Sequence, residues 1–156
     1  MTNPTIGATA PHFALCDAAG NTVTLESLLG HPFVLYFYPK DDTPGCTAEA
    51  CEFTSSLGDF AALGTRVIGI SPDSPESHAH FIRKHSLRLT LLADPEHVAA
   101  QAYGAWGLKR KDDREYEGIL RSTVLVDAKG VILHRWTNVD PFGHAQAVRQ
   151  TIAELL

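Results

Sequence analysis

Two cysteines, Cys46 and Cys51, stand five residues apart just after a proline-containing turn. The residues before this turn, 32–38, are almost continuously apolar, aromatic or β-branched, which predicts a buried strand. Thr43 is a typical N-cap residue, and Pro44 suits the first helical position because a missing N–H costs nothing there. We therefore expect Cys46 in the first turn of a helix, beside unpaired backbone N–H groups. A thiol in such a place loses its proton more easily, and the thiolate is the nucleophile.

Two other interpretations of Cys46 need weighing. Free cysteine is among the most buried residue types, so a structural core cysteine is one alternative. The expected helix first turn, beside the Thr43 hydroxyl, favours a reactive thiol instead. Metal binding is disfavoured, because structural zinc sites use C-x-x-C pairs, whereas the close pair here is C-x-x-x-x-C and His78-Ala79-His80 lies far along the chain. We expect no metal or other cofactor, and we interpret the eight histidines as surface and loop residues.

The spacing of the two cysteines also constrains how they could react with each other. On a regular helix, residues five apart have Cα atoms about 8.5 Å apart and about 140° around the axis. A disulfide tolerates a Cα separation of only about 7 Å. If Cys46 and Cys51 bond, the helix must therefore open locally, which suits a reactive thiol and a second thiol that resolves it. This spacing disfavours a thiol–disulfide exchanger, whose C-x-x-C pair can close with its helix intact.

The elements around the pair alternate between strand and helix. The patterns predict strands at 11–15, 33–38, 65–71 and 89–92, helices at 43–57, 74–85 and 94–104, a hairpin of 122–127 with 131–136, and a final helix at 143–156. In the final helix, Ala147, Ile152 and Leu155 are expected on the apolar side. The basic cluster 109–111, followed at once by two aspartates, is interpreted as a solvated loop.

This order predicts an α/β thioredoxin-like fold: a mixed central sheet flanked by helices, with an N-terminal extension. The length and the lack of a linker or repeat predict a single domain over residues 1–156. In such sheets the chemistry lies at the carboxyl ends of strands and at helix N-termini, which is where the segment 39–46 is expected.

Composition narrows the function classes. A net charge of −5 argues against a nucleic-acid or anionic-membrane partner, because both need clustered positive charge. No stretch has the apolar length that would span a bilayer. Residues 1–5 have neither a basic region nor an apolar region, so we expect no secretory signal. Three cysteines, an odd number, fit a reducing compartment, and we expect a cytoplasmic protein.

The pattern Pro39-x-x-x-Thr43-x-x-Cys46 resembles the active-site signature of the peroxiredoxins. Cys51, five residues on, is similar to the arrangement in the Q-type, or bacterioferritin comigratory protein, subfamily. The resemblance covers nearly the whole chain. It includes the stretches 7–13, 67–71, 103–107 and 121–127.

The resemblance implies that Cys46 is the peroxidatic cysteine and Cys51 the resolving cysteine. It also implies that Thr43 and Arg121 polarise the peroxide and stabilise the thiolate, while Pro39 shields the pocket from water. Physical chemistry supports these roles, because donors aimed at the peroxide oxygens stabilise the transition state and a guanidinium offers fixed cationic donors. By sequence position alone, Arg121 would be interpreted as half of a surface ion pair.

Three residues depart from the pattern or stay open. His12 stands where the family usually has an aspartate. Cys16 is an additional cysteine that ends an apolar strand, so a structural role is favoured over that of a second resolving thiol. Glu49, one turn after Cys46, either orients Arg121 or lies on a solvated helix face. The last hundred residues hold no cysteine, which excludes resolution by a C-terminal cysteine of a partner subunit.

The expected function is that of a thiol-dependent peroxidase that reduces hydrogen peroxide and organic hydroperoxides. Cys46 would become a sulfenic acid and condense with Cys51, and thioredoxin or a glutaredoxin-like dithiol would reduce the disulfide. The protein is expected to act as a monomer or weak homodimer. The alternatives are a thioredoxin-like thiol–disulfide exchanger and a redox-sensing chaperone or binding module.

Overall fold

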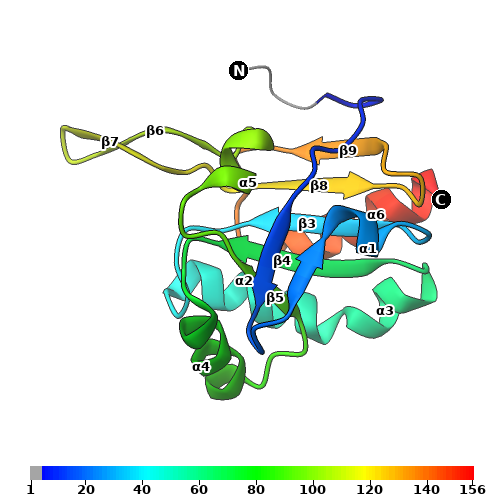
Figure 1. Cartoon of the computed structure of the whole chain (residues 1–156), viewed down its shortest axis with the longest axis horizontal. Coiled ribbons are helices and arrows are strands. Elements are labelled where there is room, and N and C mark those ends of the chain that lie inside the picture. Colours follow the sequence, from blue (N-terminus) through cyan, green and yellow to red (C-terminus); the bar gives the residue numbers. More distant parts are fainter. Residues whose placement is uncertain (1–4) are drawn as a thin grey trace.

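The computed structural model describes residues 5–156 and contains a seven-stranded sheet and a separate two-stranded ribbon (Figure 1). The strands are β1 (Ala14–Asp17), β2 (Thr22–Thr24), β3 (Phe33–Phe37), β4 (Arg66–Ser71), β5 (Thr90–Ala93), β6 (Trp106–Lys111), β7 (Arg114–Ile119), β8 (Ser122–Val126) and β9 (Ile132–Trp136). The helices are α1 (Leu25–Leu28), α2 (Pro44–Ser55), α3 (Leu57–Ala62), α4 (Pro75–His85), α5 (Val98–Ala102) and α6 (His144–Leu155). Residues 1–4, which make up most of the segment expected to lack a secretory signal, lie outside the described residues.

The main sheet has the strand order β2-β1-β5-β4-β3-β8-β9. Its centre is parallel, because β3, β4 and β5 run in the same direction, while β8 and β9 on one side and β1 and β2 on the other are antiparallel. Every residue of β3 is buried, as expected for a strand covered on both faces. The mixed sheet predicted from the order of the elements is therefore confirmed.

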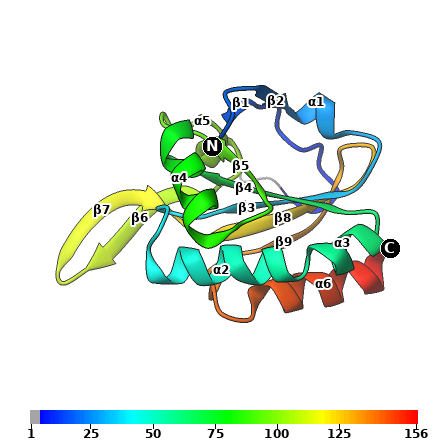
Figure 2. The ribbon, with the colours of Figure 1, turned by 90° about the horizontal axis from the view of Figure 1, so that it is seen from below.

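Two hydrophobic cores lie on opposite faces of this sheet. Alternate residues of β3 point to opposite sides, so that Phe33 and Leu35 belong to one core and Val34 and Tyr36 to the other. Helices α1 and α5 cover the first face, whereas α2, α3 and α6 cover the second (Figure 2). Helix α4 adds Phe81 to the second core. All described helices are too short or too polar to cross a lipid bilayer.

The predicted starts of α2 and α4 are confirmed, whereas the helix predicted for 94–104 spans only Val98–Ala102. Thr43 is the N-cap of α2, and Pro44 is its first residue. Ser74 caps α4 by accepting a hydrogen bond from the backbone of Ser77 at 3.1 Å. Asp94 caps α5 although it lies four residues before it, because its carboxylate accepts three backbone N–H groups of the first turn, at 2.9–3.3 Å.

Two further elements, the first strand and the helix that carries Cys46, differ in their bounds from the predictions. The first strand is Ala14–Asp17 rather than 11–15, because Pro11 has no N–H to give to a ladder, and it pairs with β2, which was not predicted. The helix predicted for 43–57 ends at Ser55, and α3 follows as a separate helix. The break falls at Ser56, which follows another serine, and serine is a weaker helix former than alanine or leucine.

The solvated loop predicted at the basic cluster 109–111 is wrong. These residues belong to the ribbon of β6 and β7, and Asp112 and Asp113 form its turn with φ values of 52° and 64°. Left-handed conformation at both turn residues matches the right-handed twist of a hairpin, and aspartate tolerates it better than most residues. The cluster is largely exposed, as expected, but it lies on a β-ribbon.

The apolar side predicted for the last helix is partly wrong. Ile152 is buried, whereas Ala147 and Leu155 are exposed. The buried residues of α6 include Ala145, Val148 and Ile152, with spacings of three and four. Leu155 ends the helix beyond the edge of the sheet, so its apolar character does not bring it into the core.

Candidate active site

Cys46 lies in the first turn of α2, beyond the carboxyl end of β3, where the sequence predicts it. Its residue is only 1% exposed. Thr43 stands one turn before it but makes no side-chain cap to the helix. Instead the Thr43 hydroxyl donates a hydrogen bond to the carbonyl of Lys40 at 2.9 Å. The first-turn N–H groups of α2 therefore receive no acceptor from Thr43.

Arg121 places its guanidinium between Cys46 and Glu49. Its Nη2 lies 3.2 Å from the Cys46 sulfur, and its Nη1 donates to Glu49 Oε1 at 2.8 Å. Arg121 stands just before β8, and the pairing of Ser122 with Phe37 brings the end of β3 beside it. The interpretation of Arg121 as half of a surface ion pair is wrong, because its side chain is 17% exposed and its partners are buried.

Glu49 is buried, so the alternative of a solvated helix face is wrong. Burial raises the pKa of Glu49 to about 7, and the charge and hydrogen bond of Arg121 offset this only in part. Its second oxygen, Oε2, has no hydrogen-bond partner among the described residues. A carboxylate with one paired and one unpaired oxygen is costly to bury, which is the physical cause of the raised pKa.

The positive charge of Arg121 changes the pKa values of nearby side chains. Burial alone would lower the pKa of Arg121, but the charges of Cys46 and Glu49 and their hydrogen bonds raise it overall. The pKa of Lys109 is lowered by burial and by the charge of Arg121. The pKa of His144 is lowered to about 4 by the same two causes. The site is thus electropositive around one permanent cation, and Lys109 is a neighbour that sequence reasoning did not identify.

A second loop borders the first turn of α2. A Cβ placed on Gly45 would lie 3.2 Å from Pro141 and 3.5 Å from Arg121 Nη2, so glycine allows both to approach closely. The backbone N–H of Val139 donates to the Arg121 carbonyl at 3.1 Å. No local sequence signal marks this loop, since only the folded chain brings it to the site. Pro39 follows β3 and is half-buried.

Cys51 is partly buried, and both it and Cys46 are free thiols on an unbroken helix. The helix predicted for this segment is therefore present while both thiols are free. Regular helix geometry keeps their Cα atoms about 8.5 Å apart, beyond the reach of a disulfide. The fold therefore brings Arg121 and Glu49 to Cys46 but leaves Cys51 outside bonding distance.

The residues that depart from the family pattern lie elsewhere. Cys16 is exposed on β1, so it is not a core residue, and the structural role favoured for it stays a prediction. It is exposed because β1 alternates between outward and inward side chains. His12 is exposed and lies 2.7 Å from Glu26.

The interpretation of all histidines as surface or loop residues is also wrong. His78 is fully buried, and His144 is 6% exposed. Both ring nitrogens of His78 have partners, because Nδ1 lies 2.8 Å from Asp41 and Nε2 lies 3.0 Å from the Leu92 carbonyl. His144 Nε2 lies 2.8 Å from the Thr123 hydroxyl.

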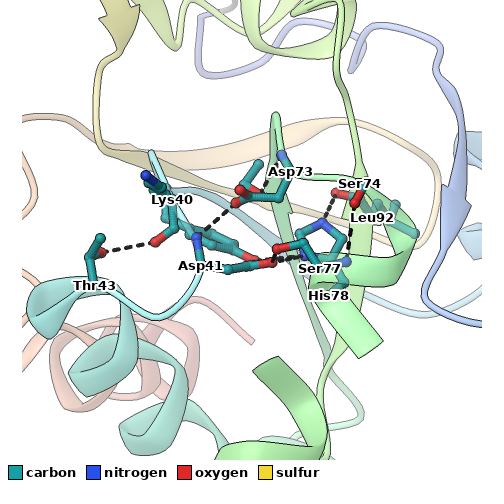
Figure 3. A network of polar contacts seen from close by, with 10 residues as sticks. Lys40, Asp41, Thr43, Asp73, Ser74, Ser77, His78 and Leu92 are labelled. Carbon is teal, nitrogen blue, oxygen red and sulfur yellow. Dashed lines mark hydrogen bonds and ion pairs between the residues drawn. The ribbon is translucent and has the colours of Figure 1, made fainter. Parts of the chain in front are cut away.

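A network of buried and half-buried polar side chains lies beside the turn before α2 (Figure 3). Asp41, Asp73 and His78 offer ligand atoms within 4.8 Å of one another, the spacing of a possible metal site. However, Asp41 accepts hydrogen bonds from the hydroxyls of Tyr38 and Ser77 at 2.6 and 2.8 Å. Asp73 accepts one from the Asp41 backbone at 2.7 Å. Protons of the protein thus already occupy the oxygens that would bind a cation.

The arrangement as a whole can support nucleophilic chemistry at sulfur. A buried cysteine lies at a helix N-terminus, and a guanidinium held by a buried carboxylate is directed at its sulfur. Both the helix N-terminus and the guanidinium stabilise negative charge, first on the sulfur and then on a leaving oxygen.

Comparisons with known proteins agree in fold and family. The model of the AhpC/TSA family matches residues 6–135. The chain is 45% identical to Peroxiredoxin Bcp of Bacillus subtilis (strain 168), with 96% of each chain covered. It is 37% identical to Peroxiredoxin Bcp of Escherichia coli (strain K12), with 95% of each covered.

Among solved structures, a cysteine-to-serine mutant of Xylella fastidiosa PrxQ superimposes with a TM-score of 0.93 and 31% identity, covering 99% of both chains. The bacterioferritin comigratory protein of Xanthomonas campestris, studied for its alkyl peroxide reduction activity, has a TM-score of 0.87 and 34% identity, with 92% of this chain and 91% of that chain covered.

Proposed function

This chain belongs to the AhpC/TSA family and is a peroxiredoxin of the Bcp/PrxQ type, a thiol peroxidase, and on that premise we propose that Cys46 is its peroxidatic cysteine. The observation that carries this proposal is the contact of 3.2 Å between Arg121 Nη2 and the sulfur of the buried Cys46. The thioredoxin-like fold supports it, because Cys46 occupies the helix N-terminus at the carboxyl end of β3.

In the first step, the Cys46 thiolate attacks the terminal oxygen of a hydroperoxide. An S–O bond forms and the O–O bond breaks, so that the sulfur is oxidised to a sulfenic acid and the peroxide is reduced. The leaving hydroxide or alkoxide takes up a proton and departs as water or alcohol. The guanidinium of Arg121 donates to the oxygens on which negative charge develops.

Thr43 has a different part in this step from Arg121. Its hydroxyl proton is directed to the Lys40 carbonyl, so only its lone pairs remain for a substrate. It therefore accepts a hydrogen bond from the O–H group of the incoming peroxide and aligns the peroxide for attack. Pro39, half-buried at the end of β3, limits the access of water.

In the second step, Cys51 attacks the sulfur of the Cys46 sulfenic acid. An S–S bond forms and the hydroxyl leaves as water. Because α2 holds the two cysteines too far apart, the helix opens before this step. A thioredoxin-type dithiol then reduces the disulfide through a mixed disulfide, restoring both thiols. The alkyl peroxide reduction studied in the Xanthomonas campestris protein supports organic hydroperoxides as substrates alongside hydrogen peroxide.

The test combines turnover with intact-mass measurement, using thioredoxin, thioredoxin reductase and NADPH. Cys46→Ser should show no turnover. Cys51→Ser should consume the first equivalent of peroxide, stall, and accumulate sulfenic and then sulfinic acid, because nothing resolves Cys46. Cys16→Ser is the matched control and should cycle normally. Turnover in Cys46→Ser would refute the assignment, and cycling of Cys51→Ser with failure of Cys16→Ser would move the resolving role to Cys16.

We also propose thioredoxin rather than a glutaredoxin-like protein as reductant, action in the cytoplasm, and a monomer or weak homodimer. The odd number of cysteines and their free thiols suit a reducing compartment. A disulfide within one chain needs no partner subunit. Comparing the two reductants in the coupled assay tests the first point, and light scattering of both redox forms tests the oligomeric state.

A further inference from the structure

We propose that Asp73 is a positioning residue of the peroxidase reaction, which fixes the orientation of the Thr43 hydroxyl through the peptide group between Lys40 and Asp41. This inference rests on the proposed function, because it acts through the part that Thr43 plays there. Asp73 lies in the connection between β4 and α4, about thirty residues from Thr43 in the sequence, and no local pattern relates the two.

The peptide group between Lys40 and Asp41 makes a hydrogen bond to Asp73 on one side and to Thr43 on the other. Its N–H, on Asp41, donates to Asp73 Oδ2 at 2.7 Å. Its C=O, on Lys40, accepts the Thr43 hydroxyl at 2.9 Å (Figure 3). A peptide group is planar and trans, so its N–H and C=O point in opposite directions. Fixing the N–H with Asp73 therefore also fixes the direction of the carbonyl that orients Thr43.

Asp73 is itself held in place. Its Oδ2 also accepts the Ser71 hydroxyl at 2.7 Å, and its backbone N–H donates to Ser71 Oγ at 3.2 Å. Ser71 is the last residue of β4, which pairs with both β3 and β5. The carboxylate is therefore tied to the centre of the sheet rather than to the helix that carries Cys46. It can stay in place when α2 opens for the disulfide.

The side chain of Asp41 ties the same turn to α4. The Leu92 carbonyl can only accept a hydrogen bond, so His78 Nε2, at 3.0 Å from it, carries a proton. On the other side of the ring, His78 Nδ1 lies 2.8 Å from Asp41 Oδ2. Tyr38 and Ser77 donate to the same carboxylate, so Asp41 is held by contacts from the end of β3 and from α4.

This network explains why the turn can hold an unfavourable backbone. Asp42 has a φ of 61°, in the left-handed region, which costs energy for a residue with a Cβ although aspartate adopts it more readily than most. Its side chain bonds Lys84 and His85 on α4 at 2.6 and 2.8 Å. The turn that orients Thr43 is thus anchored from outside its own helix. Asp41 and His78 are too deeply buried for a clean test, whereas Asp73 is only half-buried.

The test is a double-mutant cycle between Asp73 and Thr43, read by the second-order rate constant of sulfenic acid formation in stopped flow. Asp73→Ala should lower this constant about 10-fold in the wild-type background. In a Thr43→Val background it should change the constant less than about 2-fold, because the hydroxyl on which Asp73 acts is gone. Valine is suited to this position since Thr43 does not cap the helix with its side chain.

Two further variants and one further reaction separate positioning from a general loss of structure. Asp73→Asn keeps an acceptor for the Asp41 N–H and should restore most of the rate. His12→Ala removes an exposed contact of the same kind, to Glu26, that does not involve this turn, and it should leave the rate unchanged. Alkylation of Cys46 by iodoacetamide needs no oriented peroxide, so it should proceed at the wild-type rate in Asp73→Ala.

Each other outcome overturns the inference. An unchanged rate in Asp73→Ala would show that the peptide is held without the carboxylate. An equal loss in the wild-type and Thr43→Val backgrounds, or slowed alkylation, would assign Asp73 a structural role. An unchanged rate in Thr43→Val alone would refute the part of Thr43 in the proposed function and this inference with it, whereas a loss there beside a normal Asp73→Ala rate would refute this inference only.

Discussion

The buried carboxyl of Glu49 should make the stability of the protein depend on pH in a defined window. The pKa of Glu49 is raised from 4.5 to about 7, first by burial, against the opposing charge of Arg121. Between these two pH values the native protein holds a proton that the unfolded chain has released. The stability contributed by the protonated Glu49 is therefore fully present below pH 4.5 and is lost as the pH rises through about 7.

The size of the effect follows from the change in proton affinity. Each tenfold change corresponds to about 1.4 kcal/mol, so the rise from 4.5 to about 7 amounts to about 3 kcal/mol. The side chain of Glu49 is fully buried, so solvent screening does not reduce this value much. A change of this size is a large part of the free energy of unfolding of an ordinary domain.

The assay is urea unfolding of the reduced wild type and of Glu49→Gln at several pH values from about 4.5 to about 8. Glutamine keeps an oxygen that accepts Arg121 Nη1 but has no proton to lose. Subtracting the two free energies of unfolding removes the contributions of the other titrating groups. The wild type should lose about 3 kcal/mol relative to Glu49→Gln across the window. If the difference in free energy of unfolding between the two proteins stays constant within about 1 kcal/mol, Glu49 is ionised throughout the window and burial does not control its pKa.

Two further predictions concern the arginine and the helix. Arg121→Lys should slow sulfenic acid formation in stopped flow about 10-fold or more, because one ammonium group cannot occupy the places of both Nη1 and Nη2. Arg121→Ala should slow the reaction about 100-fold. A rate within 2-fold of wild type in either variant would show that the guanidinium acts only as a distant charge. Amide exchange across α2 should be faster in the disulfide form than in the reduced form, because a regular helix cannot contain a Cys46–Cys51 bond. The control, Cys51→Ser treated with peroxide, should show no such increase. Equal protection of the two forms, with the disulfide confirmed by mass, would contradict the argument that the helix opens.

Much of the local structure of the site could be read from neighbouring residues. Thr43 and Pro44 mark the start of α2, and the apolar run before them marks β3. These signals lie in consecutive residues, and a helix cap or a buried strand depends mainly on such residues. The order of elements was enough to predict the mixed sheet and the position of Cys46 beyond the carboxyl end of one of its strands.

Predictions that depended on distant surroundings were less successful. The basic cluster 109–111 was predicted as a loop, because its charge pattern gives no information about the partner strand β7 with which it pairs. The buried histidines were missed because a histidine is placed by its partners, as His78 is by Asp41 and the Leu92 carbonyl. The apolar side of α6 depends on how the helix lies against the sheet, which its own residues do not settle.

Spacing along one element is enough to predict a cysteine in the first turn of a helix and a second cysteine beyond the reach of a disulfide. The surroundings of Cys46, in contrast, depend on the tertiary fold. Arg121 lies 75 positions from Cys46 in the sequence and contacts it because β8 pairs with β3 in one register. The same pairing places the Arg121 guanidinium beside Glu49, which forms a buried ion pair with it. Ladder register and burial are set by residues far apart in the chain, so no pattern of neighbours can encode them.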